Sequence, residues 1–292
     1  MAGTLRELRE QDAGEVVGLY RSAFGDARRT DEREILSWAR NEELRSEWLR
    51  VLEVGGRVVG YGDIWIEDDE VALEVAAPGH WRTFLEWAEA AGRAEQVSRV
   101  RVLSYAGHEL ANVAAGCGYR LWRSAYTLQL EFGDRPPEAT LPPQNVKLRS
   151  FGPGDAEALR AALNDVFAGD PFFHRVTQSG FREFYLRARG TDPSLWLLAW
   201  DSAELAGFVL PVPEPPGEAG LAQIRSLGVR ASWRGRGLGE ALLRAAFREL
   251  HSRGRRRVEL GVDAENPTGA LRLYERVGMH IARQADSWAL DL

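Results

Sequence analysis

A glycine- and arginine-rich segment near the C-terminus has the residue types that bind anions. It contains Arg234 and Arg236 alternating with Gly235, Gly237 and Gly239. An amphipathic helix is predicted directly after it, with apolar residues at helical spacing over 238–250. Glycines let backbone N–H groups turn toward one point, a helix N-terminus adds partial positive charge, and arginines neutralise phosphate. The segment therefore predicts a diphosphate site.

The spacing of these residues excludes two common nucleotide-binding motifs. A P-loop needs Gly-Lys-Ser/Thr at the helix entrance, but the only lysine in the chain is Lys147. A dinucleotide fingerprint reads G-x-G-x-x-G, whereas these glycines run G-x-G-x-G from Gly235. What fits is R-x-x-G-x-G, formed by Arg234, Gly237 and Gly239. Taken alone, so short a motif is equally consistent with an arginine-rich surface turn.

The motif resembles the coenzyme A loop of GNAT-superfamily N-acetyltransferases, and residues further along the chain agree with it. That family has an asparagine after its fifth strand and a tyrosine eight residues later, and Asn266 and Tyr274 stand at this spacing. A strand is predicted over 257–262, and a helix is expected to start at Pro267. By itself Tyr274 is better explained as a core aromatic residue. Together with the loop, it is predicted to be functional.

The resemblance implies an α/β (α+β) fold with a mixed, mostly antiparallel sheet flanked by helices, and acetyl-CoA as cofactor. It implies that two neighbouring strands splay apart and that pantetheine lies between them. The N–H of Leu227 would stabilise negative charge on the thioester carbonyl, and Tyr274 would act as general acid toward the thiolate. Asn266 would bind pantetheine or fix the helix start. The implied cofactor-binding residues are Leu227, Val229, Arg234, Gly235, Arg236, Gly237, Leu238, Gly239, Glu240 and Asn266.

The general base is left open. A cysteine acyl-enzyme is not expected, because the one cysteine, Cys117, lies far from the predicted loop, so the acceptor amine would attack directly. Two tandem domains at this length are similar to the mycothiol synthase family, which acetylates a cysteinyl amine. That family has a carboxylate at the position of Gln223, which cannot accept a proton. Other carboxylates that could act through water are Glu214, Glu218, Glu259 and Asp263, each more commonly a solvated charge.

The acceptor is predicted to be a small-molecule primary amine, and the chain is expected to be a monomer or homodimer. The pocket for the acceptor amine is expected under the first helices of the second half of the chain, around Asp170, Phe172, Phe173, His174 and Arg175. A helix–helix core with a charged rim would have the same composition. Two alternatives stay open: acetylation of a cysteinyl amine, and an acetyl-CoA sensor without turnover.

The chain also contains an internal repeat. Residues 5–24 match 148–167 at an offset of 143, and 99–132 match 259–292 at an offset of 160. We expect a degenerate GNAT-like domain over 1–132, a proline-rich linker over 133–145 and a catalytic domain over 146–292. The first copy has Ala106 and Ala114 where the second has Asn266 and Tyr274. It is also six residues shorter around the glycine–arginine loop, so it is predicted not to bind coenzyme A in the same way.

Composition narrows the class of protein. The 292 residues are 45% hydrophobic and 27% charged, which is typical of globular domains. A net charge of −6 argues against nucleic acid as a partner. The sequence shows no apolar run of membrane-spanning length, no basic-then-apolar leader, and no metal-ligand spacing among its five histidines. A cytoplasmic protein without a metal or a membrane partner is therefore expected.

Overall fold

The computed structural model describes residues 3–25, 27–28, 30–40, 45–67, 69–170, 173–215 and 220–292. These residues form two compact units. Unit 1 contains the described residues up to Tyr126 together with Asp263–Glu265 and Arg283–Leu292, and unit 2 contains Thr127–Val262 and Asn266–Ala282. Within the described ranges, no helix is both long and apolar enough to span a lipid bilayer.

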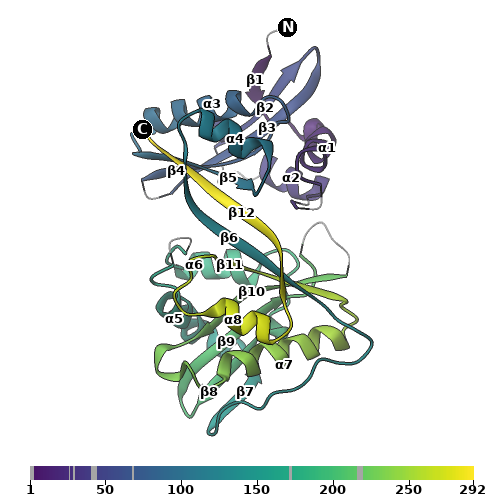
Figure 1. Ribbon diagram of the computed structural model, residues 1–292, viewed down its shortest axis with the longest axis vertical. Helices are drawn as coiled ribbons and strands as arrows, with labels where there is room; N and C mark the ends of the chain where they lie inside the picture. The colour runs from purple at the N-terminus through teal and green to yellow at the C-terminus, as the bar shows by residue number, and fades with distance from the viewer. Residues whose placement is uncertain are drawn as a thin grey trace. The chain divides into compact units, whose positions relative to one another are not determined.

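Unit 1 is a mixed sheet with helices against it (Figure 1). Its strands follow the order β1-β2-β3-β4-β5-β12, and β6 pairs with β12 on the other side. Neighbouring strands from β1 to β12 are antiparallel, except for the parallel pair β4–β5. Its main elements are β1 (Thr4–Glu7), α1 (Ala13–Phe24), α2 (Glu32–Ala39), β2 (Leu49–Val54), β3 (Arg57–Glu67), β4 (Glu70–Ala76), α3 (Trp81–Glu95), β5 (Arg99–Tyr105), α4 (Glu109–Gly116), β6 (Arg120–Glu131) and β12 (His280–Asp291).

Unit 2 repeats this arrangement. Its strand order is β6-β11-β10-β9-β8-β7; β10 and β11 are parallel, while β7–β8, β8–β9 and β9–β10 are antiparallel. Its main elements are β7 (Val146–Ser150), α5 (Ala156–Val166), α6 (Gln178–Gly180), η4 (Phe181–Leu186), β8 (Leu197–Asp201), β9 (Glu204–Val212), β10 (Leu221–Val229), α7 (Leu238–Ser252), β11 (Arg257–Asp263) and α8 (Ala270–Arg276). The mixed, mostly antiparallel sheet with flanking helices confirms the predicted fold class.

The last strand of each sequence repeat serves the other unit. The end of β6, from Thr127 on, belongs to unit 2, whereas β12 from Arg283 on belongs to unit 1. There β12 pairs with β5 over seven residues, from Ala285 opposite Tyr105 to Asp291 opposite Arg99. Each compact unit therefore includes the end of the last strand of the other sequence repeat.

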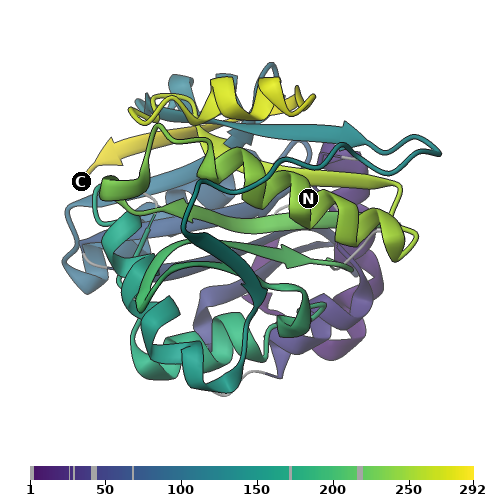
Figure 2. The same cartoon turned by 90° about the horizontal axis from the view of Figure 1, so that it is seen from below.

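Two helices cover opposite faces of the unit 2 sheet. Helix α7 packs on β8, β9 and β10, as Figure 2 shows, and α5 packs on β9 and β10. Successive residues of a strand face opposite sides of the sheet. In β9, Gly207 faces Leu238 and Leu242 of α7. The next residue, Phe208, faces Phe167 at the end of α5. The apolar faces of both helices thus meet a strand that is buried almost throughout.

An arginine–aspartate pair appears at the same place in both copies. Arg6 bonds Asp12 at 2.7 Å in unit 1, and Arg149 bonds Asp155 at 2.6 Å in unit 2, at the repeat offset of 143. Neither aspartate caps the following helix by a side-chain bond; each accepts instead from the backbone N–H three residues before it. The arginine lowers the pKa of the Asp155 carboxyl below its ordinary value. The repeat thus preserves a specific contact as well as a pattern of apolar residues.

The placement of β12 leads to a prediction about stability. Trp288 of β12 packs against the core of unit 1, so Trp288→Ala should lower the free energy of unfolding by about 2–3 kcal/mol. Ile281→Ala, at an exposed position of the same strand, is the matched control and should change it by less than about 0.5 kcal/mol. Hydrogen exchange should show faster exchange in β5 and unchanged exchange in β8 and β9. Equal loss of protection in both units would contradict the assignment.

Candidate active site

The parallel strands β10 and β11 diverge in the middle of unit 2. Within the described parts of both strands, pairing starts at Leu221 opposite Arg257 and ends at Gln223 opposite Glu259. Strand β10 continues for six residues beyond Gln223 and β11 for four beyond Glu259, without further pairing to each other. This is the splay implied by the sequence resemblance. It leaves backbone hydrogen-bonding groups on the β11 side of β10 available to an extended ligand.

The register on the other side of β10 decides which backbone groups face this gap. Val229 lies opposite Gly207 of β9, and the N–H of the next residue, Arg230, donates to Ala206 O at 3.0 Å. Because hydrogen-bonding alternates along an antiparallel pair, Leu227 and Val229 direct their N–H and C=O groups away from β9. Val229 O indeed accepts from Arg234 Nε at 2.9 Å instead. The N–H groups of Leu227 and Val229 thus face away from β9, and Val229 O is engaged by the loop.

The loop after β10 uses its glycines for two different reasons. Gly235 and Gly237 have φ of 72° and 81°, and a Cβ at either position would meet no atom within 4 Å. They are therefore glycines because of the left-handed backbone. Gly239 has ordinary helical geometry, but a Cβ there would lie 3.0 Å from Leu273 of α8. That glycine allows α8 to lie against the start of α7.

The first turn of α7 presents free backbone donors. The first intrahelical bond runs from Ala241 N to Gly237 O at 3.1 Å, so the N–H groups of residues 238–240 have no partner within the helix. Gly237 stands at the N-cap position, where it has no side chain to cap them. The side chain of Glu240, predicted to bind the cofactor, pairs with Arg244 at 2.9 Å. The group of Glu240 that remains available in this turn is its backbone N–H.

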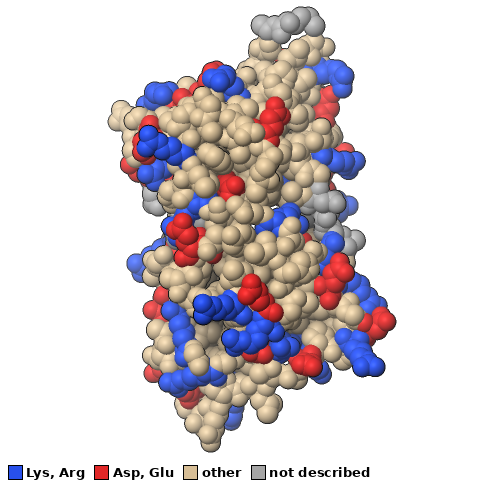
Figure 3. Space-filling model, in the orientation of Figure 1, with Lys and Arg blue, Asp and Glu red and all other residues tan. Residues whose placement is uncertain are grey.

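Positive charge surrounds this turn. Arg234 and Arg236 are exposed, and neither forms an ion pair within the described part of the chain. Figure 3 shows basic side chains in the region of α8, where Arg272 and Arg276 are also exposed. The loop is held by Trp233 Nε1, which donates to Asp201 Oδ2 at 3.1 Å, and by the Arg230–Asp165 ion pair at 3.2 Å. The structure thus combines free amides and unpaired cations, as an anion site requires.

Tyr274 lies on α8 with its ring buried at 7% exposure. Within the described residues its hydroxyl makes no hydrogen bond, so it is available to a ligand. Burial raises the pKa of Tyr274 to about 12. A phenol with this pKa remains protonated at physiological pH and can donate a proton, but it cannot serve as a base. The packing role and the functional role are therefore compatible, because the ring is in the core and the hydroxyl is free.

Asn266 has a local role in the structure. Its Oδ1 accepts from Thr268 N at 2.9 Å and from the Thr268 hydroxyl, which forms a turn before α8. The helix itself begins at Ala270 after Gly269, so the prediction that it starts at Pro267 is wrong by three residues. The physical reason is that the Asx turn and the left-handed Gly269 (φ 73°) intervene before regular helix can form. Of the two roles implied for Asn266, the turn is the one with a contact in the structure.

The candidate bases are mostly engaged. Asp263 Oδ2 accepts from Arg123 at 2.8 Å, and Glu214 pairs with Arg255 at 2.6 Å. Glu259 is buried and interacts with other described residues, and it lies opposite the exposed Gln223. Glu218 lies outside the described residues. The carboxylates of Asp263 and Glu214 are thus both engaged by arginines in the structure.

The residues predicted to surround the acceptor differ in their burial. Phe173 packs against Phe167 at 5.3 Å and belongs to the apolar core, whereas His174 and Arg175 are exposed. Asp170 interacts with other described residues, and Phe172 lies outside them.

Sequence reasoning missed two residues near this region, Arg225 of β10 and Tyr185 of η4. The guanidinium of Arg225 lies 5.7 Å from the centroid of the Tyr185 ring. The available signal was a charged residue in the predicted strand, two residues before Leu227.

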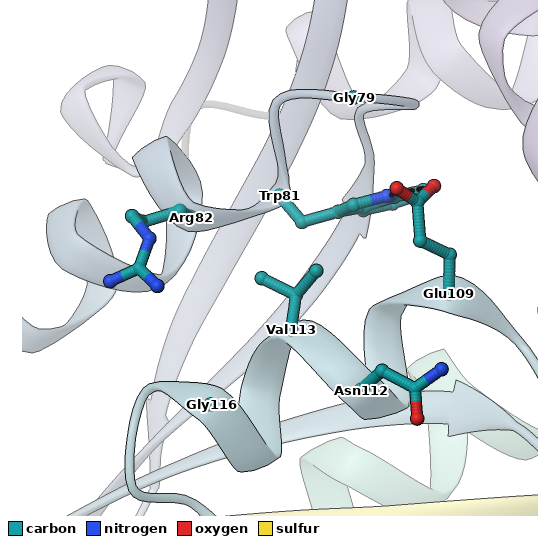
Figure 4. Close-up of a pocket in the computed structure, with 7 residues that line it drawn as sticks. All are labelled: Gly79, Trp81, Arg82, Glu109, Asn112, Val113 and Gly116. Atoms are coloured by element: carbon teal, nitrogen blue, oxygen red, sulfur yellow. Dashed lines mark hydrogen bonds between the residues drawn. The ribbon is translucent and has the colours of Figure 1, made fainter.

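The equivalent place in unit 1 is built differently. A cavity of about 350 Å³ lies between the start of α3 and α4. Figure 4 shows the residues that line it, Gly79, Trp81, Arg82, Glu109, Asn112, Val113 and Gly116. Trp81 Nε1 donates to Glu109 Oε2 at 2.9 Å, so a carboxylate stands beside the helix start. A carboxylate there repels phosphate.

The six residues missing from the first copy do not all come from the loop. Helix α7 starts nine residues after Val229, but α3 starts six after its counterpart Val75, which accounts for three of them. The other three are missing between the end of α3 and Val102, so attributing all six to the loop was wrong. The helices themselves have the same length of 15 residues, which is why the sequence comparison could not separate the two gaps.

Comparison with known proteins assigns the family. Residues 161–279 match the Acetyltransferase (GNAT) family. The chain is 34% identical to the mycothiol acetyltransferase of Salinispora arenicola, over 91% of this chain and 89% of the relative. It is 30% identical to the mycothiol acetyltransferase of Streptomyces coelicolor, over 94% and 90% of the two chains. The chain therefore belongs to the GNAT acetyltransferase family, and it is an N-acetyltransferase by that membership.

Solved structures agree with this assignment. A GCN5-related N-acetyltransferase from Sphaerobacter thermophilus superposes with a TM-score of 0.81 at 28% identity, covering 99% of this chain and 95% of the other. A tandem GNAT protein from the clavulanic acid biosynthesis pathway superposes with a TM-score of 0.73 at 16% identity, covering 99% and 98%. The second likeness shows that the fold is shared over the full tandem length.

The loop glycines can be tested separately. Gly237→Ala should destabilise the chain by about 1–2 kcal/mol, because alanine resists the left-handed backbone although the space around it is open. Gly237→Asn, whose side chain tolerates this conformation, should cost less. Urea unfolding of the two variants and the wild type measures the difference. If alanine and asparagine cost the same, backbone strain is not the reason for the glycine.

Proposed function

We propose that unit 2 transfers an acetyl group from acetyl-CoA to a small-molecule primary amine, by direct attack of the amine. The observation that carries the proposal is the gap between β10 and β11, which Leu227 and Val229 face with their backbone groups. The pantetheine arm is extended and amide-containing, so it can bond to this edge as an additional strand would. The free amides of residues 238–240 and the unpaired Arg234 and Arg236 supply the diphosphate site.

The reaction then needs two groups at the thioester. The Leu227 N–H stabilises the oxyanion that forms when the amine attacks the carbonyl carbon. Tyr274 donates its phenolic proton to the departing thiolate sulfur, which its raised pKa of about 12 permits because the phenol stays neutral. The nitrogen of the primary amine loses one of its two protons, to solvent or to a carboxylate acting through water, and keeps the other as the amide N–H. The Tyr274 phenolate then regains its proton from solvent. A covalent enzyme intermediate is not required, since Cys117 lies in unit 1.

Unit 1 is proposed not to catalyse transfer. By the repeat offset of 160, Tyr274 corresponds to Ala114 of α4, which has no hydroxyl. The carboxylate of Glu109 also stands where the second copy has Gly269, beside the start of α3. A scaffold role for unit 1 is consistent with both features.

A cysteinyl amine is the second candidate acceptor, because the relatives described above are named mycothiol acetyltransferases. Against it stands Gln223, at the position where the sequence resemblance implies a carboxylate; its side chain is exposed and cannot accept a proton. The direct test is thiol release from acetyl-CoA with a panel of primary amines that includes a cysteinyl amine. Tight coenzyme A binding without turnover on any amine would instead indicate a sensor.

Arg234→Gln tests the diphosphate site. We expect acetyl-CoA to bind about tenfold more weakly, because one charge-assisted contact to phosphate is lost. Arg253→Gln, at the opposite end of α7 where Arg253 pairs with Glu249, is the matched control and should not change the affinity. Isothermal titration calorimetry measures both. Undiminished affinity of the Arg234 variant would contradict the assignment of the diphosphate to this loop.

Tyr274→Phe tests the general acid. We expect kcat to fall about 100-fold with an unchanged dissociation constant for acetyl-CoA, because only proton donation is lost. Tyr119→Phe, a buried tyrosine of unit 1, should have wild-type kcat. Since burial raises the pKa of Tyr274 to about 12, the wild-type rate at saturating amine should not decline around pH 10. A decline there that disappears in Tyr274→Phe would contradict the raised pKa.

A further inference from the structure

Strand β10 contains a bulge immediately before the predicted acetyl site. Ile224 pairs with Pro211 of β9 and Ser226 pairs with Leu210, so Arg225 is an extra residue without a partner in β9. The corresponding strands of unit 1, β3 and β4, run in continuous register from Tyr61 opposite Ala76 to Glu67 opposite Glu70. Bulges redirect side chains and are frequent beside active sites. This bulge is present only in the unit that has the glycine loop.

The bulge directs Arg225 toward η4. One guanidinium nitrogen donates to Phe184 O, and the guanidinium lies over the Tyr185 ring, 5.7 Å from its centroid. Tyr185 is held in turn by stacking on Phe181, with ring centroids 5.5 Å apart at an angle of 19°. Arg225 is therefore positioned from two sides, by a backbone oxygen and by an aromatic face.

Among the described residues, Arg225 has no carboxylate that balances its charge. It is half-buried, and within the described part of the chain no carboxylate lies within ion-pair distance of it. Burial lowers the pKa of Arg225, and the nearby Tyr185 opposes this effect. A partly desolvated cation without a counter-charge destabilises the unliganded protein, and an anionic ligand would offset that cost.

We propose that Arg225, supported by Tyr185, binds an anionic group of the acceptor, a carboxylate close to the amine that is acetylated. Arg225 precedes Leu227 by two residues, about 7 Å along a strand, so an amine at the thioester and a carboxylate at Arg225 can belong to one small molecule. The planar guanidinium suits a carboxylate because it can offer two parallel donors. This inference rests on the proposed function and specifies the acceptor class as amino acid-like amines.

The test compares each acid with its uncharged amide. Acetylation of glycine and glycinamide, β-alanine and β-alaninamide, and cysteine and cysteinamide is measured with wild type, Arg225→Gln and Arg182→Gln. Arg182 is an exposed arginine of η4 and serves as the matched control. We expect wild type and Arg182→Gln to favour at least one acid over its amide by about tenfold to a hundredfold in kcat/KM, the range for a hydrogen-bonded charge. Arg225→Gln should lose this preference, keep its activity toward the amide, and keep its affinity for acetyl-CoA.

A preference of the wild type for every amide, or a preference for acids that survives in Arg225→Gln, would overturn the proposal while leaving acetyl transfer intact.

Binding provides a second measurement that does not depend on turnover. Saturation-transfer NMR in the presence of coenzyme A should detect N-acetylglycine but not N-acetylglycinamide on the wild type, and neither on Arg225→Gln. Equal signals for acid and amide on the wild type would overturn the assignment even if no amine is acetylated. Absence of acetyl-CoA binding would count against the proposed function itself.

Discussion

Two parallel strands that stop pairing after three residues are the constraint on which the site of unit 2 depends. Because β10 leaves β11 after Gln223, the backbone of Leu227 and Val229 has no strand on its second side. Unpaired backbone groups are costly when they are buried, so this edge is stable only beside solvent or a ligand that bonds to it. The glycine loop, the free first turn of α7 and Tyr274 on α8 all belong to the same unit as this edge.

The repeat makes the contrast between the two copies informative. Both have a parallel pair with few paired residues, a helix of 15 residues and the same arginine–aspartate contact at the start. They differ in the groups that bind charge: loop cations and free amides in unit 2, and a carboxylate beside the helix start in unit 1. The two copies thus share their packing and differ in their polar residues. The exchange of β6 and β12 gives a physical reason for retention of unit 1, since unit 1 contains the end of β12 and unit 2 the end of β6.

Much of the site could be predicted, because its features are local in sequence. Positive φ at Gly235 and Gly237 follows from glycines placed between a strand and a helix, and the helix start follows from apolar periodicity. The start of α8 was misjudged because an Asx turn at Asn266 competes with the preference of proline for a first helical turn. Arg225 was missed because a bulge depends on the register between two strands, which no single strand reveals.

By itself, the sequence determined the fold class, the repeat, the glycine–arginine turn before α7 and the tyrosine at its characteristic spacing, since each depends on short-range periodicity and residue type. The tertiary structure decided which strand completes which sheet, because strands with similar apolar patterns can pair with either copy and only the assembled sheets select one. It also decided which charges remain unbalanced. Asp263 and Glu214 are neutralised by arginines far away in sequence, whereas Arg225 has no such partner within the described residues. The net charge of a region is visible in its sequence, but the pairing of its charges exists only in three dimensions.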